Sequence, residues 1–298
     1  MQWGARVKTL GVVIDLDPPR DPGHSRKFVT IGHTETRVAE LQSTILEILS
    51  RGKISCKDAE RLRGRLQWFE SFASGRVAQQ SLRVISGLAS SGRNREELGE
   101  KERSALLFLK DRVLASPPTK VMSSNLTTWV IFSDGACEGE ESKLGSVGAV
   151  LFGQDGRPVE FFSEKMDDEW MNFLLEGSSH PVFELELLPV LVALQVWKGK
   201  LSCCQAVFYL DNEAAKGALI QGSTTNQVGN LILQKFVLEE MSCQLKVWFA
   251  RVPTSSNVAD KPSRLDVTEL NAKGVNRVQI QWKSLLEQLR RTRSLEWG

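Results

Sequence analysis

Four acidic residues occupy positions where a carboxylate has a chemical use. Asp134 follows the apolar run Trp-Val-Ile-Phe-Ser, and Asp211 follows the apolar run Val-Phe-Tyr-Leu. Glu186 begins an otherwise apolar helical face, and Asp260 lies in the segment Asn-Val-Ala-Asp-Lys-Pro-Ser-Arg of residues 257–264. Carboxylate oxygens without His or Cys suit hard cations such as Mg²⁺, and two ions about 3.5–4 Å apart promote phosphodiester hydrolysis. The sequence therefore predicts a site for two Mg²⁺ ions at these four residues.

The elements that must position these residues follow from the hydrophobic pattern. Short β-branched or apolar runs predict strands, and apolar residues at helical spacing predict helices. The predicted strands are 127–133, 148–153, 159–165, 206–210 and 245–251, and the predicted helices are 184–197, 213–219, 226–240 and 256–266. Three successive strands followed by alternating helices and strands indicate an α/β fold with a mixed sheet flanked by helices. Ligands bind beyond the carboxyl ends of strands in such sheets, so Asp134 and Asp211 should share one site.

Glu184 is an alternative to Glu186 on the same helix. Residues two apart on an α-helix lie roughly 200° apart around its axis, so only one of these glutamates can face the site. Pro189 cannot donate a helical hydrogen bond and crowds the carbonyl of Leu185, which predicts a kink beside the candidate residue.

The front of the chain has a different character. Residues 1–120 carry a net charge of +7 and the remainder −5, which gives +2 for the whole chain. A hairpin of residues 9–16 and 28–31 should precede helices that begin at residues 36, 55, 77 and 98. The positive charge either follows a phosphate backbone or belongs to an ordinary solvated helical surface.

The run Ala-Ser-Pro-Pro-Thr at residues 115–119 is the clearest break, which places a domain boundary near residues 116–124. We expect a hairpin and helical domain at residues 1–118, an α/β domain at 119–266, and a tail at 267–298 with a helix near 283–291. No apolar run is long enough for a membrane span, and the first residues lack a secretory leader pattern. Five cysteines without a paired spacing indicate reduced thiols in an intracellular protein of the nucleus or cytoplasm.

Residues 125–265 resemble the ribonuclease H domain of a retroelement reverse transcriptase. The resemblance is carried by residues 132–137, 145–151, 186–194, 208–213 and 252–264. It implies a five-stranded sheet with its first three strands antiparallel, and catalytic metal ligands at the four carboxylates named above. It also implies hydrolysis of the RNA strand of RNA–DNA hybrids with Mg²⁺, for which Mn²⁺ can substitute.

Residues 10–115 are similar to the palm end and thumb of such a reverse transcriptase, of the DIRS-like, tyrosine-recombinase group. No Tyr-x-Asp-Asp motif is present, so polymerase chemistry would come from a partner chain or from an N-terminal polymerase domain outside this sequence. The expected partner is an RNA–DNA hybrid. The candidate nucleic-acid contacts are Lys57, Arg61, Arg65 and Arg76, together with Asn212 and Asn257 beside the carboxylates.

Two other functions compete with an active ribonuclease H. The first is a degenerate retroelement remnant that binds nucleic acid without cutting it, because many relatives carry a His before the last Asp and residues 241–260 contain none. The second is a 3′–5′ exonuclease of the same fold, although such enzymes usually begin with Asp-x-Glu rather than Asp-Gly-Ala.

Overall fold

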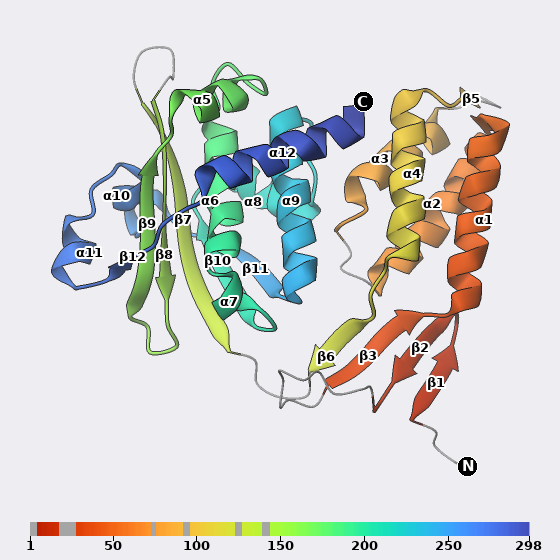
Figure 1. Cartoon of the computed structure of the whole chain (residues 1–298), viewed down its shortest axis with the longest axis horizontal. Coiled ribbons are helices and arrows are strands. Elements are labelled where there is room, and N and C mark those ends of the chain that lie inside the picture. Colours follow the sequence, from red (N-terminus) through yellow and green to blue (C-terminus); the bar gives the residue numbers. More distant parts are fainter. Residues whose placement is uncertain are drawn as a thin grey trace. The chain divides into compact units, whose positions relative to one another are not determined.

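The computed structural model describes residues 5–17, 28–72, 76–91, 96–122, 127–138 and 144–297 (Figure 1). The chain forms two compact units, one of residues 1–125 with 296–298 and one of residues 126–295. Among the helices in these described ranges, none is both long enough and apolar enough to cross a membrane.

The first unit combines a small antiparallel sheet with four helices. The sheet has the order β1-β2-β3-β6, and a two-stranded sheet pairs β4 with β5. The strands are β1 (Arg6–Thr9), β2 (Val12–Asp15), β3 (Phe28–His33), β4 (Lys53–Ile54), β5 (Glu96–Glu97) and β6 (Thr119–Met122). The helices are α1 (Glu35–Arg51), α2 (Cys56–Ser71), α3 (Gln79–Ser90) and α4 (Glu100–Leu114).

Local sequence explains where these helices begin and end. The side chain of Thr34 accepts a hydrogen bond from the Arg37 N–H and caps α1, and Ser55 caps α2 in the same way. Gly52 ends α1 in the left-handed conformation that glycine adopts without strain. The four helices bury one shared core of mostly Leu and Ile side chains.

The strand β6 corrects the expected domain boundary. Residues Thr119–Met122 pair antiparallel with β3, so they complete the first sheet. The expected start of the α/β domain at residue 119 is therefore too early. Residues 123 and 124 of the expected boundary region lie outside the described residues.

The second unit contains a mixed sheet of order β11-β10-β7-β8-β9-β12. Its strands are β7 (Thr128–Glu138), β8 (Leu144–Phe152), β9 (Pro158–Lys165), β10 (Gln205–Leu210), β11 (Lys246–Arg251) and β12 (Asn276–Arg277). The strand β8 pairs antiparallel with both β7 and β9, and β10 pairs parallel with both β7 and β11. The expected α/β class, with a mixed sheet flanked by helices, is confirmed.

The helices of this unit include one that is buried along most of its length. They are α5 (Asp168–Leu175), α6 (Val182–Val196), α7 (Lys198–Leu201), α8 (Glu213–Gln221), α9 (Gln227–Cys243), α10 (Asp260–Ser263), α11 (Thr268–Ala272) and α12 (Trp282–Trp297). Every residue of α6 from Glu184 to Leu194 is buried, because this helix packs on the sheet and against α9. The helix α5 was not expected from the sequence.

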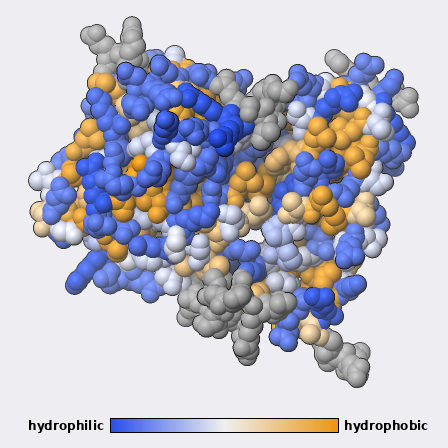
Figure 2. All heavy atoms as spheres, viewed as in Figure 1, coloured by the Kyte–Doolittle hydropathy of each residue, from blue (hydrophilic) through white to orange (hydrophobic). Residues whose placement is uncertain are grey.

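The expected tail at residues 267–298 is not a separate region, because residues 267–295 belong to the second unit, and the helix expected near 283–291 lies within α12. The strand β12 pairs parallel with β9 and gives the sheet a sixth strand at its edge. Leu285, Leu286 and Leu289 of α12 are buried, and the ring of Trp282 lies edge-on to Trp170 of α5. Hydrophilic residues cover the visible surface of α12 (Figure 2), as expected for an amphipathic surface helix.

Candidate metal centre

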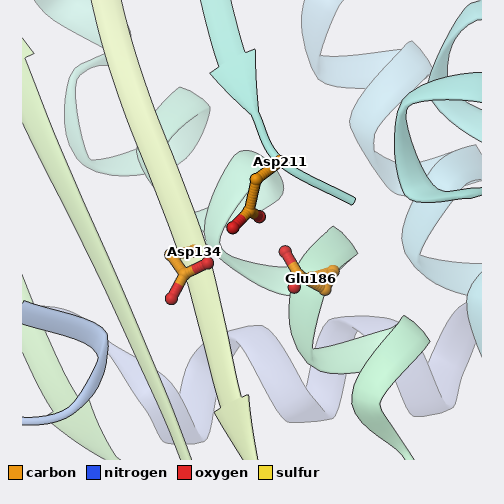
Figure 3. Close-up of side chains that lie close together, drawn as sticks. All are labelled: Asp134, Glu186 and Asp211. Carbon is orange, nitrogen blue, oxygen red and sulfur yellow. The ribbon is translucent and has the colours of Figure 1, made fainter. Parts of the chain in front are cut away.

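Three carboxylates from three separate elements converge at one place. Asp134 lies on β7, Glu186 on α6, and Asp211 directly after the end of β10, and their side chains point toward one another (Figure 3). One oxygen of each carboxylate lies within 4.8 Å of one oxygen of each of the other two. Such a spacing allows all three oxygens to contact a single cation.

The carboxylate of Asp134 is held by the segment around α10. Asp134 is buried, with 4% of its surface exposed. The hydroxyl of Ser263 hydrogen-bonds to Asp134 Oδ2, and the Asn257 side-chain amide donates to Asp134 Oδ1 at 3.4 Å. These two contacts fix the orientation of the carboxylate without any ion.

Glu186 is buried to a similar degree, with 6% exposed. The Asn212 side chain and the Gly135 backbone N–H both donate hydrogen bonds to its carboxyl group. Its Oε2 atom is buried and has no hydrogen-bond partner among the residues that the structure describes. An unpartnered carboxylate oxygen is costly to bury, so this atom needs either a proton or a cation.

Burial dominates the electrostatics of these two acids. The pKa of Asp134 is raised to about 7, mainly by burial and in part by the charges of Asp211 and Asp260, while the hydrogen bond from Ser263 opposes the increase. Burial likewise raises the pKa of Glu186 to about 9, with added repulsion from Asp134 and Asp211. Adjacent carboxylates without a cation favour protonation, because like charges at this distance oppose ionisation.

The fourth candidate, Asp260, lies beside this group but not within it. Its charge acts on Asp134, yet its Oδ1 atom accepts a hydrogen bond from Arg264 Nε at 3.2 Å. The structure thus brings together three of the four predicted ligands and places the fourth next to them, paired with a guanidinium.

Two glycines allow helices to approach the sheet closely at this point. A Cβ atom on Gly135 would lie 2.2 Å from the Leu185 carbonyl oxygen of α6. A Cβ atom on Gly148 of β8 would lie 2.4 Å from the Ser263 backbone nitrogen of α10. Gly148 pairs with Asp134, and consecutive residues point to opposite faces of a strand, so α6 and α10 lie against opposite faces of the sheet. Both helices reach the position of Asp134 because these residues lack side chains.

The two candidate glutamates have different surroundings. Glu184 is also buried, but its Oε1 atom accepts a hydrogen bond from the Asn226 side-chain amide at 2.7 Å. It therefore connects α6 to the start of α9, and only Glu186 joins the cluster. The helix α6 includes Pro189 within its length, and the kink expected there stays a prediction.

The two asparagines predicted as nucleic-acid contacts serve the cluster itself. Asn257 is buried, and its amide group contacts the Ser133 carbonyl, Asp134 and the Ala259 N–H. These contacts of its buried side chain lie within the domain, and a contact of Asn257 with nucleic acid stays a prediction. Asn212 caps α8 through its Oδ1 atom and also donates to Glu186, so its contacts likewise organise the site.

The basic candidates of the first unit form part of one helical face. Lys57, Arg61 and Arg65 are spaced four residues apart on α2, so they follow one another along the helix surface. Lys57 and Arg61 are exposed, while Arg65 hydrogen-bonds to the Thr44 hydroxyl of α1. Arg76 lies outside this row, before α3, and is half-buried.

Sequence reasoning missed three residues of the site, namely Gly135, Ser263 and Arg264. A signal was present for each. Gly135 follows the first carboxylate directly, and the other two lie three and four residues after Asp260, which is one helical turn.

Solved structures with similarity to about half of this chain are ribonuclease H proteins. The N-terminal ribonuclease H domain of Rv2228c from Mycobacterium tuberculosis is 14% identical, with a TM-score of 0.37 over 50% of this chain and 99% of that chain. RNase H1 from Halobacterium salinarum is 17% identical, with a TM-score of 0.36 over 48% and 98%. LC11-RNase H1 in complex with an RNA/DNA hybrid is 16% identical, with a TM-score of 0.36 over 48% and 99%. No protein-family model and no curated protein matches the chain.

The donor set fits a hard divalent cation. All three converging groups are carboxylates, the ligands that Mg²⁺ and Mn²⁺ prefer. A cation bound there would supply the partner that the buried Oε2 atom of Glu186 lacks.

Proposed function

We propose that the second unit is a metal-dependent endonuclease that hydrolyses the RNA strand of RNA–DNA hybrids by a two-metal mechanism. The observation that carries this proposal is the convergence of Asp134, Glu186 and Asp211, with a buried oxygen of Glu186 left without a donor. The hybrid is the substrate class that the motifs at residues 132–137 and 252–264 imply.

Each residue of the site has a defined task in this proposal. Asp134, Glu186, Asp211 and Asp260 would hold the ions, which are Mg²⁺ with Mn²⁺ as a substitute. Held by these residues, the ions would supply a lower pKa for the attacking water and stabilisation of charge on the leaving oxygen. Asn257 and Ser263 hold the Asp134 carboxylate in one orientation, so less ordering is needed when the ions bind.

The wider context proposed is a retroelement reverse transcriptase that acts in the nucleus or cytoplasm. The first unit would be its palm end and thumb, and would hold the hybrid through Lys57, Arg61, Arg65 and Arg76. Positive side chains contact the phosphates and position the duplex without reading its sequence. Polymerase chemistry would come from another chain or from a domain outside this sequence.

One observation favours a second candidate, a remnant that binds nucleic acid without cutting it. Asp260 is paired with Arg264 and lies outside the group of three converging carboxylates. If this pair persisted with metal present, the site would lack a fourth ligand.

A substrate panel tests the proposal. The purified chain is incubated with labelled RNA–DNA hybrid, duplex DNA, duplex RNA and single strands, with Mg²⁺, Mn²⁺ or a chelator. We expect the RNA strand of the hybrid alone to be cut, only with metal, and not by Asp134→Asn. Cutting of DNA would favour an exonuclease-like activity, whereas hybrid binding without cutting in any metal would support the remnant.

A further inference from the structure

Arg264 forms a bridge at the edge of the candidate metal centre. Its Nε atom donates to Asp260 Oδ1 at 3.2 Å, and its Nη1 atom donates to Glu138 Oε1 at 2.8 Å. The two acceptors lie on different elements, because Asp260 begins α10 and Glu138 ends β7. The guanidinium thus uses separate nitrogens to join a candidate metal ligand to a carboxylate four residues beyond Asp134.

This arrangement places a permanent positive charge where a metal ion would need a ligand. Arg remains charged at every physiological pH. A divalent ion that uses Asp260 Oδ1 has to displace the Nε hydrogen bond, since both would approach the same oxygen. The exposed side-chain fractions are 53% for Arg264 and 31% for Asp260, so the bridge is open to solvent and to incoming ions.

We propose that Arg264 competes with the second metal ion for Asp260, and that Glu138 keeps the displaced guanidinium at the edge of the site. Arg264 is thus a positioning residue that acts through Asp260. Metal binding at Asp134, Glu186 and Asp211 meets no such competitor among the ion pairs of the described residues. The inference rests on the proposed function, because it assumes two ions at this centre.

The structure offers matched variants for a test. Arg264→Gln removes the competing charge and keeps amide donors near Asp260. Lys261→Gln removes the same charge three residues away, in α10, but Lys261 pairs with Glu269, outside the site. Glu138→Gln weakens the second partner of Arg264, so it should leave the guanidinium more firmly on Asp260.

The measurement is Mn²⁺ binding to the whole chain, followed by the electron paramagnetic resonance signal of free Mn²⁺. We expect two classes of site in the unmodified chain. In Arg264→Gln, the dissociation constant of the weaker Mn²⁺ site should fall about three- to tenfold, which means tighter binding. This size corresponds to the loss of one partly exposed ion pair that competes with a divalent ion. Glu138→Gln should raise the dissociation constant of the weaker Mn²⁺ site, and Lys261→Gln should leave it unchanged.

The sign and location of the effects decide the outcome. If Arg264→Gln leaves the weaker constant unchanged or raises it, Arg264 does not compete for Asp260. An equal tightening in Lys261→Gln would show a general charge effect and would also overturn the inference. Absence of Mn²⁺ binding by the unmodified chain would overturn the proposed function as well as this inference. Two classes of Mn²⁺ site that Arg264→Gln leaves unchanged would overturn this inference alone.

Discussion

At the residue scale, the same burial that orients the carboxylates also makes them hard to ionise. Asp134 and Glu186 are both nearly buried, and the pKa of each is raised, to about 7 and about 9. A cation removes this penalty because it binds only the ionised form. Proton release and metal binding are therefore coupled at this site.

This coupling predicts a pH-dependent stability of the metal-free protein. The folded pKa values of Asp134 and Glu186 lie above their unfolded values of 3.8 and 4.5. Their contribution to stability is therefore fully present below about pH 4 and is lost as the pH rises through 7 and then 9. In chelator, we expect the Tm of the second unit to fall by at least about 5 °C between pH 5 and pH 9.

Calorimetry with added Mg²⁺ provides the companion measurement. Mg²⁺ should raise the Tm more at pH 9 than at pH 6, since fewer protons must be displaced at the higher pH. In chelator, the variant Glu186→Gln should show a smaller fall of Tm with increasing pH, because it removes the group with the higher pKa. A Tm in chelator that stays level or increases from pH 5 to pH 9 would contradict the environment described for these acids.

Residue types and spacing predicted the positions of the carboxylates but not their supporting contacts. Asp134 and Asp211 each follow an apolar run, which is visible in the chain itself. The contacts of Asp134 with Asn257 and Ser263 join residues 123 and 129 positions apart, so nothing local in the sequence indicates them.

At the element scale, the position of Glu186 depends on how closely α6 approaches β7. Pro189 has no N–H for the Leu185 carbonyl, and that carbonyl lies against Gly135. The sequence shows the proline but not the strand beside it, so it does not indicate that the carbonyl left without a helical partner faces Gly135. Close backbone packing at Gly135 places the carboxylates of both elements together.

This packing predicts that Gly135→Ala is strongly destabilising. The added Cβ would meet backbone atoms of α6, which cannot rotate away as a flexible side chain can. We expect a loss of about 1–3 kcal/mol or more in the free energy of unfolding, together with weaker Mn²⁺ binding, because α6 must move away from β7. Denaturant unfolding and Mn²⁺ titration measure the two effects.

The matched control is Gly217→Ala in α8. Among the described residues, no atom outside the adjoining backbone of α8 lies within 4 Å of a Cβ at Gly217, and alanine in a helix is favoured over glycine by up to about 1 kcal/mol. This variant should therefore unfold at a denaturant concentration equal to or higher than that of the unmodified chain. If Gly135→Ala behaved in the same way, the close approach of α6 would have no energetic importance.

At the scale of the whole molecule, the chain divides into two units with different charge and architecture. The charge shift along the sequence and the break at residues 115–119 predicted this division, but the last strand of the first sheet lies beyond the break. The tail was also harder to predict, because β12 is only two residues long and pairs with β9, more than a hundred positions earlier. Short strands carry little periodicity, so only tertiary pairing defines them.

If the first unit holds a hybrid, its exposed α2 lysine should contribute to salt-dependent affinity. We expect Lys57→Gln to weaken hybrid binding. The slope of the logarithm of the binding constant against the logarithm of the salt concentration should decrease in magnitude by about one, since one phosphate contact is lost. Lys101→Gln, an exposed lysine on α4 with the same change in charge, should keep the slope. Fluorescence anisotropy over a range of salt concentrations measures both, and equal slopes for the two variants would argue against a specific role for α2.

The central claim, that Glu186 belongs to a catalytic metal centre, is tested most directly by hybrid cleavage with Glu186→Gln and Glu184→Gln. The two residues lie on the same helix and are both buried, and the same chemical change is made at each. Only Glu186 joins Asp134 and Asp211, whereas Glu184 contacts Asn226. We predict Mg²⁺-dependent cutting of the RNA strand that Glu186→Gln reduces by at least about a hundredfold and Glu184→Gln largely retains. Equal activity of the two variants, or full activity of Glu186→Gln, would contradict the account.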